Sequence, residues 1–335
     1  MSGIVEIAKK AGVSPATVSR ALRGMHHVNE RTRKKIIEAA QLLEYPIRPD
    51  LLPESAKVRT NTIGVIAPFI SRWYFSQVLA GIEQALREAG MDLLLYNFAQ
   101  VDARQRVFQQ RKLVGKVDGL IVISLPPTEK EFEEILGLGI PVSLVGTFNE
   151  KCSCVSIDDT KGAEIATQHL IDMGHRDIGI MVGQNAAAYN FEVADQRLTG
   201  FKKVLSENGI EFNPAWQITA DFDSHTSELA MDEFLRQKKL PTAIFCESDE
   251  MAFGAISSMR KRGLRVPEDI SFIGYDDHEY ANFLGLTTIS QPVQFLGQLA
   301  ASQIMAKIEK PESKITQMQV PTNLVVRTSV RNLTK

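Results

Sequence analysis

Residues 4–24 read IVEIAKKAGVSPATVSRALRG, and their pattern predicts two short helices joined by a tight turn. Gly12 permits the turn, because a residue without a Cβ adopts a positive φ at little cost. Ser14 is a preferred capping residue, and Pro15 follows at the first helical position, where no backbone donor is lost. A short helix presented in this way, with Arg20 on an outer face, is typical of the unit that enters the DNA major groove.

The same region continues with a third helix and a linker. Residues 30–43 repeat apolar side chains at helical spacing, with basic residues on the opposite side, and Asn29 can cap this helix. We therefore predict an all-α helix-turn-helix DNA-binding domain over residues 1–46. Residues 47–61 hold prolines and few periodic apolar positions, which indicates a hinge or linker.

Charge is divided unevenly along the chain. Residues 1–60 contain 11 lysines and arginines against 6 aspartates and glutamates, whereas the remainder contains 27 against 34. A basic head on an acidic body is typical of a DNA-reading module attached to a sensor domain.

From Thr62 onward, short β-rich apolar runs alternate with amphipathic helices. This alternation predicts βαβ units, and hence mainly parallel sheets with helices on both faces. One sheet would need more than ten strands, so we predict an α/β domain of two doubly wound subdomains. The runs lie at 62–68, 91–97, 118–124, 140–146, 178–183, 216–221, 242–247 and 270–276, and the helices at 75–89, 103–115, 129–137, 159–173, 192–208, 225–237 and 249–262.

The later part of the chain is expected to pass back between the two subdomains. A run at 287–291 and a helix at 293–308 should return it to the first subdomain. The predicted domain 62–335 then divides into a first subdomain at about 62–159 and 290–320 and a second at about 160–289 and 321–335.

Residues just after the strands are the candidates for a ligand site, because doubly wound folds bind ligands at the carboxyl ends of their strands. Trp73, Tyr74 and Phe75 can stack on a flat or ring-shaped ligand. Arginine and carboxylate side chains follow later strands, and this mixture suits a polyhydroxylated or other small polar molecule. The candidate ligand-binding residues are Arg72, Tyr74, Phe75, Arg197, Phe222, Ser248, Asp249 and Asp276.

Several protein classes fit the sequence poorly. No run approaches the ~20 apolar residues of a membrane span, and the N-terminus lacks a signal-peptide pattern, so we expect a cytoplasmic protein without a membrane partner. Cys152, Cys154 and Cys246 fit a reducing compartment, and no Cys or His cluster completes a metal site, so we expect no metal and no cofactor. Phosphate-binding glycine loops and the nucleophile elbow are absent, which argues against an enzyme. A solute-binding protein would not need the basic head.

The motifs GVSPATVSRALRG (12–24), SDEMAFGAI (248–256) and GYDDHEY (274–280) followed by LTTISQP (286–292) together resemble the LacI/GalR (lactose-repressor/galactose-repressor) family of transcriptional regulators. The resemblance covers essentially the whole chain. It implies a homodimer that binds a pseudo-palindromic operator in double-stranded DNA. It also implies a periplasmic-binding-protein-like domain whose small-molecule effector, by default a carbohydrate, controls operator affinity. A nucleobase or a protein partner is the alternative signal.

The resemblance also implies roles in the head. Three residues of the second helix fall where the family reads bases, namely Pro15, Ala16 and Arg20, and Thr17 and Ser19 fall where it contacts phosphates or supports the helix. The full candidate DNA-binding set is Ser14, Pro15, Ala16, Thr17, Ser19, Arg20, Arg23, Asn29 and Leu52.

The linker departs from the family pattern, which places a leucine wedge in the minor groove. The position that corresponds to this leucine depends on where in the linker the alignment with the family pattern begins. It falls on Glu54, Ser55 or Ala56, none of which is leucine. A small side chain unstacks bases poorly, so we hypothesise that Leu51 or Leu52 substitutes as the wedge.

In the second domain, Arg197 and Asp276 match the family's ligand arginine and aspartate, and Phe75, Phe222 and Ser248 match lining positions. Arg72 departs from the asparagine that is frequent in its place. Its positive charge could favour a phosphorylated or acidic effector.

Overall fold

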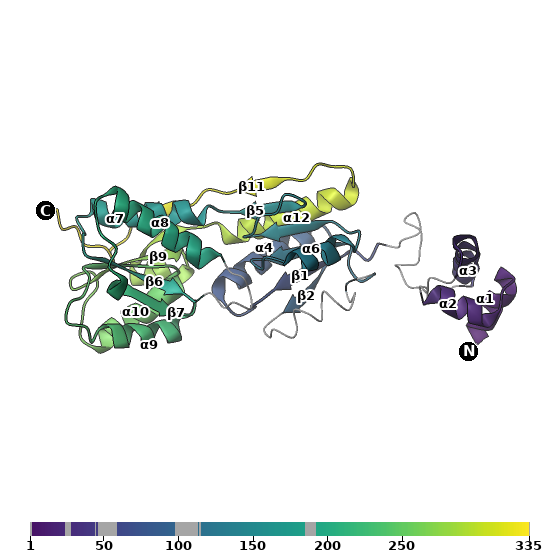
Figure 1. Ribbon diagram of the computed structural model, residues 1–335, viewed down its shortest axis with the longest axis horizontal. Coiled ribbons are helices and arrows are strands. Elements are labelled where there is room, and N and C mark those ends of the chain that lie inside the picture. Colours follow the sequence, from purple (N-terminus) through teal and green to yellow (C-terminus); the bar gives the residue numbers. More distant parts are fainter. Residues whose placement is uncertain are drawn as a thin grey trace.

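The computed structural model describes residues 2–23, 28–43, 45, 59–97, 113, 115–184 and 192–334. It consists of a small helical head and two α/β lobes, each built on its own sheet (Figure 1). No helix within these ranges is long and apolar enough to cross a membrane.

Three helices form the head, as the sequence predicts: α1 (Ser2–Ala11), α2 (Pro15–Leu22) and α3 (Glu30–Leu42). They enclose a small apolar core. Its buried members are Ile7, Ala8, Val18, Ala21, Val28, Ile36, Ala39 and Ala40.

Both predicted caps are present in the head. The Ser14 hydroxyl accepts a hydrogen bond from the Thr17 backbone N–H at 3.1 Å, at the start of α2. Asn29 accepts one from the Thr32 backbone N–H at 2.8 Å, at the start of α3. Gly12 has a φ of +67° and lets the chain turn between α1 and α2. These contacts fix the orientation of α2 on the other two helices.

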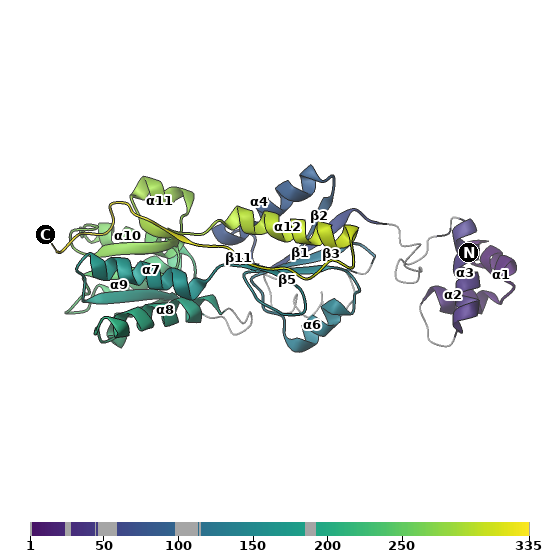
Figure 2. The same ribbon diagram turned by 90° about the horizontal axis from the view of Figure 1, so that it is seen from above.

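The first lobe contains a sheet of six parallel strands in the order β11-β5-β4-β3-β1-β2. Helices α4 and α12 cover one face and α6 covers the other (Figure 2). The elements are β1 (Thr62–Ala67), α4 (Trp73–Glu88), β2 (Asp92–Asn97), β3 (Gly119–Ile123), α6 (Glu129–Leu136), β4 (Val142–Val145), β5 (Ser153–Ser156), α12 (Val293–Glu309) and β11 (Gln317–Gln319).

The second lobe contains a six-stranded sheet in the order β12-β10-β9-β8-β6-β7, parallel except that β12 runs antiparallel to β10. Helices α7 and α8 pack together, as do α9 and α10. The elements are α7 (Asp159–Asp172), β6 (Ile178–Gly183), α8 (Val193–Glu207), the 3-10 helix η3 (Pro214–Trp216), β7 (Gln217–Ala220), α9 (Ser224–Phe234), β8 (Ala243–Cys246), α10 (Asp249–Lys261), β9 (Ser271–Asp276), α11 (Glu279–Leu284), β10 (Thr287–Ser290) and β12 (Asn323–Val325).

One expectation about the chain path is wrong. The strand at 287–290 pairs with β9 of the second sheet and does not begin the return to the first lobe. The return begins with α12, which packs closely on α4. A Cβ on Gly81 would lie 1.9 Å from the Gln294 carbonyl oxygen, and one on Gly297 would lie 2.2 Å from the Val78 carbonyl oxygen. The two glycines therefore permit the backbone-to-backbone contact that joins α12 to the first lobe.

Five short elements among the described residues are not anticipated by the sequence patterns: β5, η3, α11, β11 and β12. Each has three to six residues, too few for an apolar period to be visible. The helix predicted at 103–115 falls almost entirely outside the described residues.

Candidate functional site

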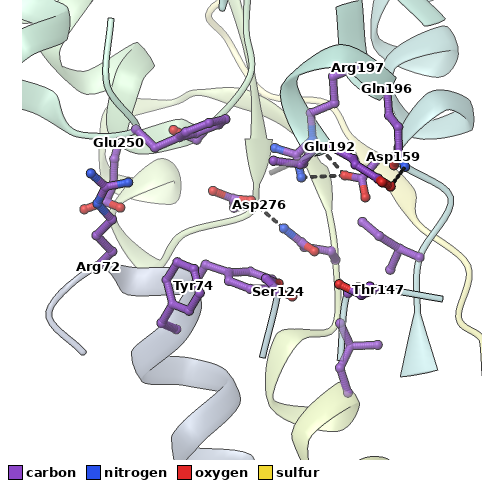
Figure 3. A pocket seen from close by; sticks show the side chains of 18 of the residues that line it. Arg72, Tyr74, Ser124, Thr147, Asp159, Glu192, Gln196, Arg197, Glu250 and Asp276 are labelled. Atoms are coloured by element: carbon purple, nitrogen blue, oxygen red, sulfur yellow. Dashed lines mark hydrogen bonds and ion pairs between the residues drawn. The ribbon is translucent and has the colours of Figure 1, made fainter. Parts of the chain in front are cut away.

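A pocket lies between the two lobes, at the carboxyl ends of the strands (Figure 3). Its empty volume, counted with its open mouth, is about 930 Å³. The lining residues are Arg72, Tyr74, Phe75, Ser124, Pro126, Gly146, Thr147, Ile157, Asp159, Glu192, Val193, Gln196, Arg197, Phe222, Ser248, Glu250, Asp276, Gln291 and Leu296.

Seven of the eight ligand-binding candidates line this pocket: Arg72, Tyr74, Phe75, Arg197, Phe222, Ser248 and Asp276. Asp249 does not line it. Its side chain is fully buried, and its two oxygens accept hydrogen bonds from the Thr288 hydroxyl at 2.7 Å and the His278 backbone N–H at 2.8 Å. The position therefore gives Asp249 a structural role that ties α10 to β10 and to the residue before α11.

Trp73 also differs from its expectation as a ligand-stacking side chain. It is not among the lining residues, and its ring stacks instead on His278 of the second lobe, with 4.9 Å between ring centroids.

Arg197 is held in place by three groups at the pocket wall. Its Nε donates to the Asp159 carboxylate at 2.8 Å, and its Nη1 donates to the Glu247 carbonyl oxygen. Its guanidinium carbon lies 3.6 Å from the centroid of the Tyr275 ring. Only 4% of Arg197 is exposed, so the charge is almost fully desolvated and depends on these partners.

Asp276 ends strand β9 in an unusual backbone conformation, with a φ of 122°. Few non-glycine residues adopt this region, and such strain is concentrated at functional sites. One carboxylate oxygen accepts a hydrogen bond from the Gln291 side-chain amide at 2.5 Å. Burial, opposed by Arg197, raises the pKa of Asp276 to about 7. The carboxyl group can therefore gain or lose its proton near neutral pH.

Aromatic side chains form the apolar part of the wall. The Tyr74 hydroxyl accepts a hydrogen bond from Ser124 at 3.2 Å, and burial raises the pKa of Tyr74 to about 12. The Phe222 ring passes over Gly183, where a Cβ would lie 2.0 Å from the ring. Phe75 is buried beside Tyr74, with 5.2 Å between ring centroids in an edge-to-face arrangement. These rings can pack against the apolar face of a ligand.

Several polar lining residues are missed by the sequence reasoning. Asp159 follows β5, a strand that the sequence pattern does not reveal. Glu250 lies two residues after Ser248 and could have been found from its place at the start of the same helix. The missed polar residues are Ser124, Thr147, Asp159, Glu192, Gln196, Glu250 and Gln291.

Carboxylates outnumber cations around the pocket. The acidic lining residues are Asp159, Glu192, Glu250 and Asp276, and the basic ones are Arg72 and Arg197. Arg72 lies next to Glu250 at one side of the pocket (Figure 3). Burial raises the pKa of Glu250, against the opposing effects of the Trp73 backbone and of Arg72. Arg72 is therefore near a carboxylate that offsets its charge, which weakens the argument for an acidic effector.

The head presents the predicted DNA-binding residues on and beside α2. Pro15, Ala16 and Arg20 are exposed, as are Arg23 and Asn29. The remaining candidates in this region are the exposed Ser14 and the half-buried Thr17 and Ser19. The hydroxyl oxygens of Ser14 and Thr17 lie 2.8 Å apart and form a hydrogen bond. Leu52, the substitute wedge, lies outside the described residues.

Within the ranges that the structure describes, no group of three or more His, Cys, Asp and Glu residues is arranged to hold a metal ion. Cys152, Cys154 and Cys246 are all buried thiols.

Family models match both parts of the chain. The model for bacterial regulatory proteins of the lacI family matches residues 3–46, and the periplasmic binding protein-like domain matches residues 167–330. Among curated proteins, the ribose operon repressor of Haemophilus influenzae is 33% identical over 340 residues, covering 99% of this chain and 100% of that protein. The transcriptional repressor PurR of Vibrio campbellii is 32% identical over 342 residues, with 99% and 100% covered.

Solved structures agree with the fold. A LacI-family regulator from Enterococcus faecium with bound ribose matches with a TM-score of 0.72 and 28% identity, covering 81% of this chain and 99% of that one. The lac repressor dimer bound to operator and the anti-inducer ONPF matches with a TM-score of 0.70 and 26% identity, covering 97% and 98%. Both of these curated relatives are named as repressors. The chain therefore belongs to the LacI family of bacterial regulatory proteins, as a repressor with a helix-turn-helix head and a periplasmic-binding-protein-like effector domain.

Proposed function

We propose that the protein is a homodimeric, cytoplasmic repressor whose affinity for a pseudo-palindromic operator is controlled by a small neutral carbohydrate bound between the lobes. The observation that carries the effector class is the composition of the pocket. Arg197 and Asp276 offer a donor and an acceptor at the pocket wall, and aromatic rings cover an apolar part of it. Hydroxyl groups of a sugar suit the polar groups, and its C–H faces suit the rings.

The excess of carboxylates argues for a neutral effector over a phosphorylated one. A phosphate would meet four acidic lining residues, and the two arginines beside it already face carboxylates. Placing like charges together in a partly desolvated pocket is costly, whereas a neutral polyol avoids that cost.

A nucleobase is the second candidate. Tyr74 and Phe222 could pack against a flat ring, and one curated relative is the repressor PurR. A protein partner that acts through the same lobes is a third candidate, and it would leave the pocket without a small-molecule ligand.

In the head, we assign base reading to α2. Arg20 is exposed and can form a bidentate hydrogen bond with a guanine, whereas Pro15 and Ala16 can contribute only apolar contact and shape. Two heads in a dimer would place these helices in successive major grooves, about 34 Å apart. Sedimentation of the full chain as a dimer supports this arrangement, and a monomer at micromolar concentration contradicts it.

The experiment that tests the proposal is a thermal-shift screen with sugars, sugar phosphates and purine bases, followed by binding to DNA from the region upstream of the protein's own gene. A neutral sugar should stabilise the protein and change its affinity for this DNA. Stabilisation by a purine base alone would favour the second candidate.

A further inference from the structure

Trp73, the first residue of α4, reaches from the first lobe into the second. Its indole Nε1 donates to the Glu279 carboxylate, and its ring stacks on His278 with an interplanar angle of 28°. The His278 ring also contacts Phe253 and Tyr280, with centroid distances of 5.2 and 5.0 Å. Trp73 therefore joins an aromatic group that belongs otherwise to the second lobe.

The second lobe also places a carboxylate near the start of α4. The first backbone N–H groups of a helix have no partner within it. Arg72, at the capping position, makes no side-chain cap, and the first turn holds no acidic residue. The Glu250 carboxylate, at the start of α10, lies near the Trp73 backbone N–H, whose dipole favours the charged form and lowers the pKa of this carboxyl group against the effect of burial. A carboxylate at this position also interacts favourably with the helix dipole.

These contacts converge beside the pocket. Arg72 and Glu250 line it, and Trp73 lies between Arg72 and the pocket residue Tyr74 in sequence. Because the partners belong to different lobes, the contacts form only while the lobes are together. Moving the lobes apart would separate an aromatic stack, an indole hydrogen bond and a carboxylate from the start of a helix in one step.

We propose that Trp73, Glu250 and Glu279 form an interlobe clasp that stabilises the closed arrangement of the lobes and so sets how tightly the pocket holds its effector. This inference rests on the proposed function, because it assigns a regulatory element to the same pocket. The three are positioning residues: they act by raising the population of the arrangement in which both walls of the pocket meet the ligand. A ligand that binds the closed arrangement gains in apparent affinity as that population rises.

Tryptophan fluorescence offers a direct test that needs neither DNA nor effector. The chain has two tryptophans, and Trp216 is buried in the second lobe, where its indole donates to the Lys239 carbonyl oxygen. In a Trp216→Phe background, Trp73 is the sole emitter. Glu279→Ala removes the acceptor of its indole, Glu279→Gln keeps a carbonyl acceptor, and Glu233→Ala is a charge-matched control on the surface of α9.

We expect Glu279→Ala to raise acrylamide quenching of Trp73 by about twofold or more, because the open population grows. Small-angle X-ray scattering of the same variants should show a larger radius of gyration. Glu279→Gln should restore most of both values, and Glu233→Ala should change neither. A circular-dichroism melt confirms that each variant is folded.

Two results would overturn the clasp. One is quenching that does not differ between the Glu279→Ala and Glu233→Ala variants. The other is a change in Trp73 emission while the scattering profile stays unchanged. In that case the contact would affect only the surroundings of Trp73 and not the separation of the two lobes. Because both readouts are free of ligand and DNA, they remain decisive even if the effector class proposed above is wrong.

Discussion

Arg197 donates to Asp159 through Nε at 2.8 Å, so the arginine at the pocket wall is already paired with a carboxylate. Asp159 begins α7 and Arg197 lies on α8, and the bond therefore joins two helices of the second lobe as well as shaping the pocket. The pair leaves a nearly neutral wall with hydrogen-bond donors and acceptors, which is the property expected of a site for a hydroxylated ligand.

Arg197→Ala should affect both stability and effector response. Removing one partner of a buried pair leaves Asp159 uncompensated, and such changes cost about 3–5 kcal/mol of unfolding free energy. Chemical denaturation measures this loss. Operator binding by the folded variant should persist, and its response to effector should disappear.

A double-mutant cycle controls that prediction. Adding Asp159→Ala to Arg197→Ala should recover part of the stability, because it removes the unpaired carboxylate. Additive losses in the double variant would show that the two side chains do not depend on one another.

The raised pKa of Asp276 predicts that the free energy of unfolding depends on pH in a specific way. Its folded pKa of about 7 lies above its ordinary value of 3.8, so the folded state retains a proton that the unfolded state has lost. The contribution of this group to the free energy of unfolding therefore falls as pH rises from about 4 to about 7, and is constant above that range.

Comparison with Asp276→Asn isolates this contribution, because asparagine stays neutral at every pH. The unfolding free energy of the wild type minus that of the variant should decline between about pH 4 and 7. A difference that stays constant across the range would show that the pKa of Asp276 is not raised.

Arg20→Ala should separate sequence recognition from general DNA affinity. Loss of a bidentate guanine contact should cost about 1–3 kcal/mol of preference for the operator over other DNA. Fluorescence anisotropy at several salt concentrations measures both affinities. The control Arg31→Ala removes an exposed charge from α3 and should weaken binding to all sequences alike. Equal losses for operator and random DNA in Arg20→Ala would contradict base reading.

Gly297→Ala tests the packing of α12 on α4. The added Cβ would lie 2.2 Å from the Val78 carbonyl oxygen, so the helices must separate, and the expected loss is about 1–3 kcal/mol. Ser302→Ala, on an exposed position of the same helix, should change the unfolding free energy by less than about 0.5 kcal/mol. Equal stability of the two variants would show that α12 can move aside.

The sequence was sufficient for the long, periodic elements and for residues at their ends. Ser14 and Asn29 could be assigned as caps because capping depends on local chemistry. Arg72, Arg197 and Asp276 could be placed near the pocket because parallel strands bring their carboxyl ends to one edge.

The features that the sequence does not predict depend on tertiary contacts. Asp249 and Ser248 are neighbours in sequence, yet only Ser248 lines the pocket, because Asp249 turns inward to Thr288 and His278. The partner of Trp73 lies more than 200 residues away, and no period in the sequence reports such a contact. Short strands such as β5 are stabilised by their neighbours in the sheet and leave little trace in local composition.

The most direct test of the central claim is operator binding by the purified protein, measured with and without each compound that stabilises it in the thermal-shift screen. The account predicts that a neutral sugar changes operator affinity by about 5- to 150-fold, the range of typical allosteric coupling, and that Arg197→Ala abolishes the change. Operator affinity that stays the same in the presence of every stabilising compound would contradict control of this repressor through the pocket between its lobes.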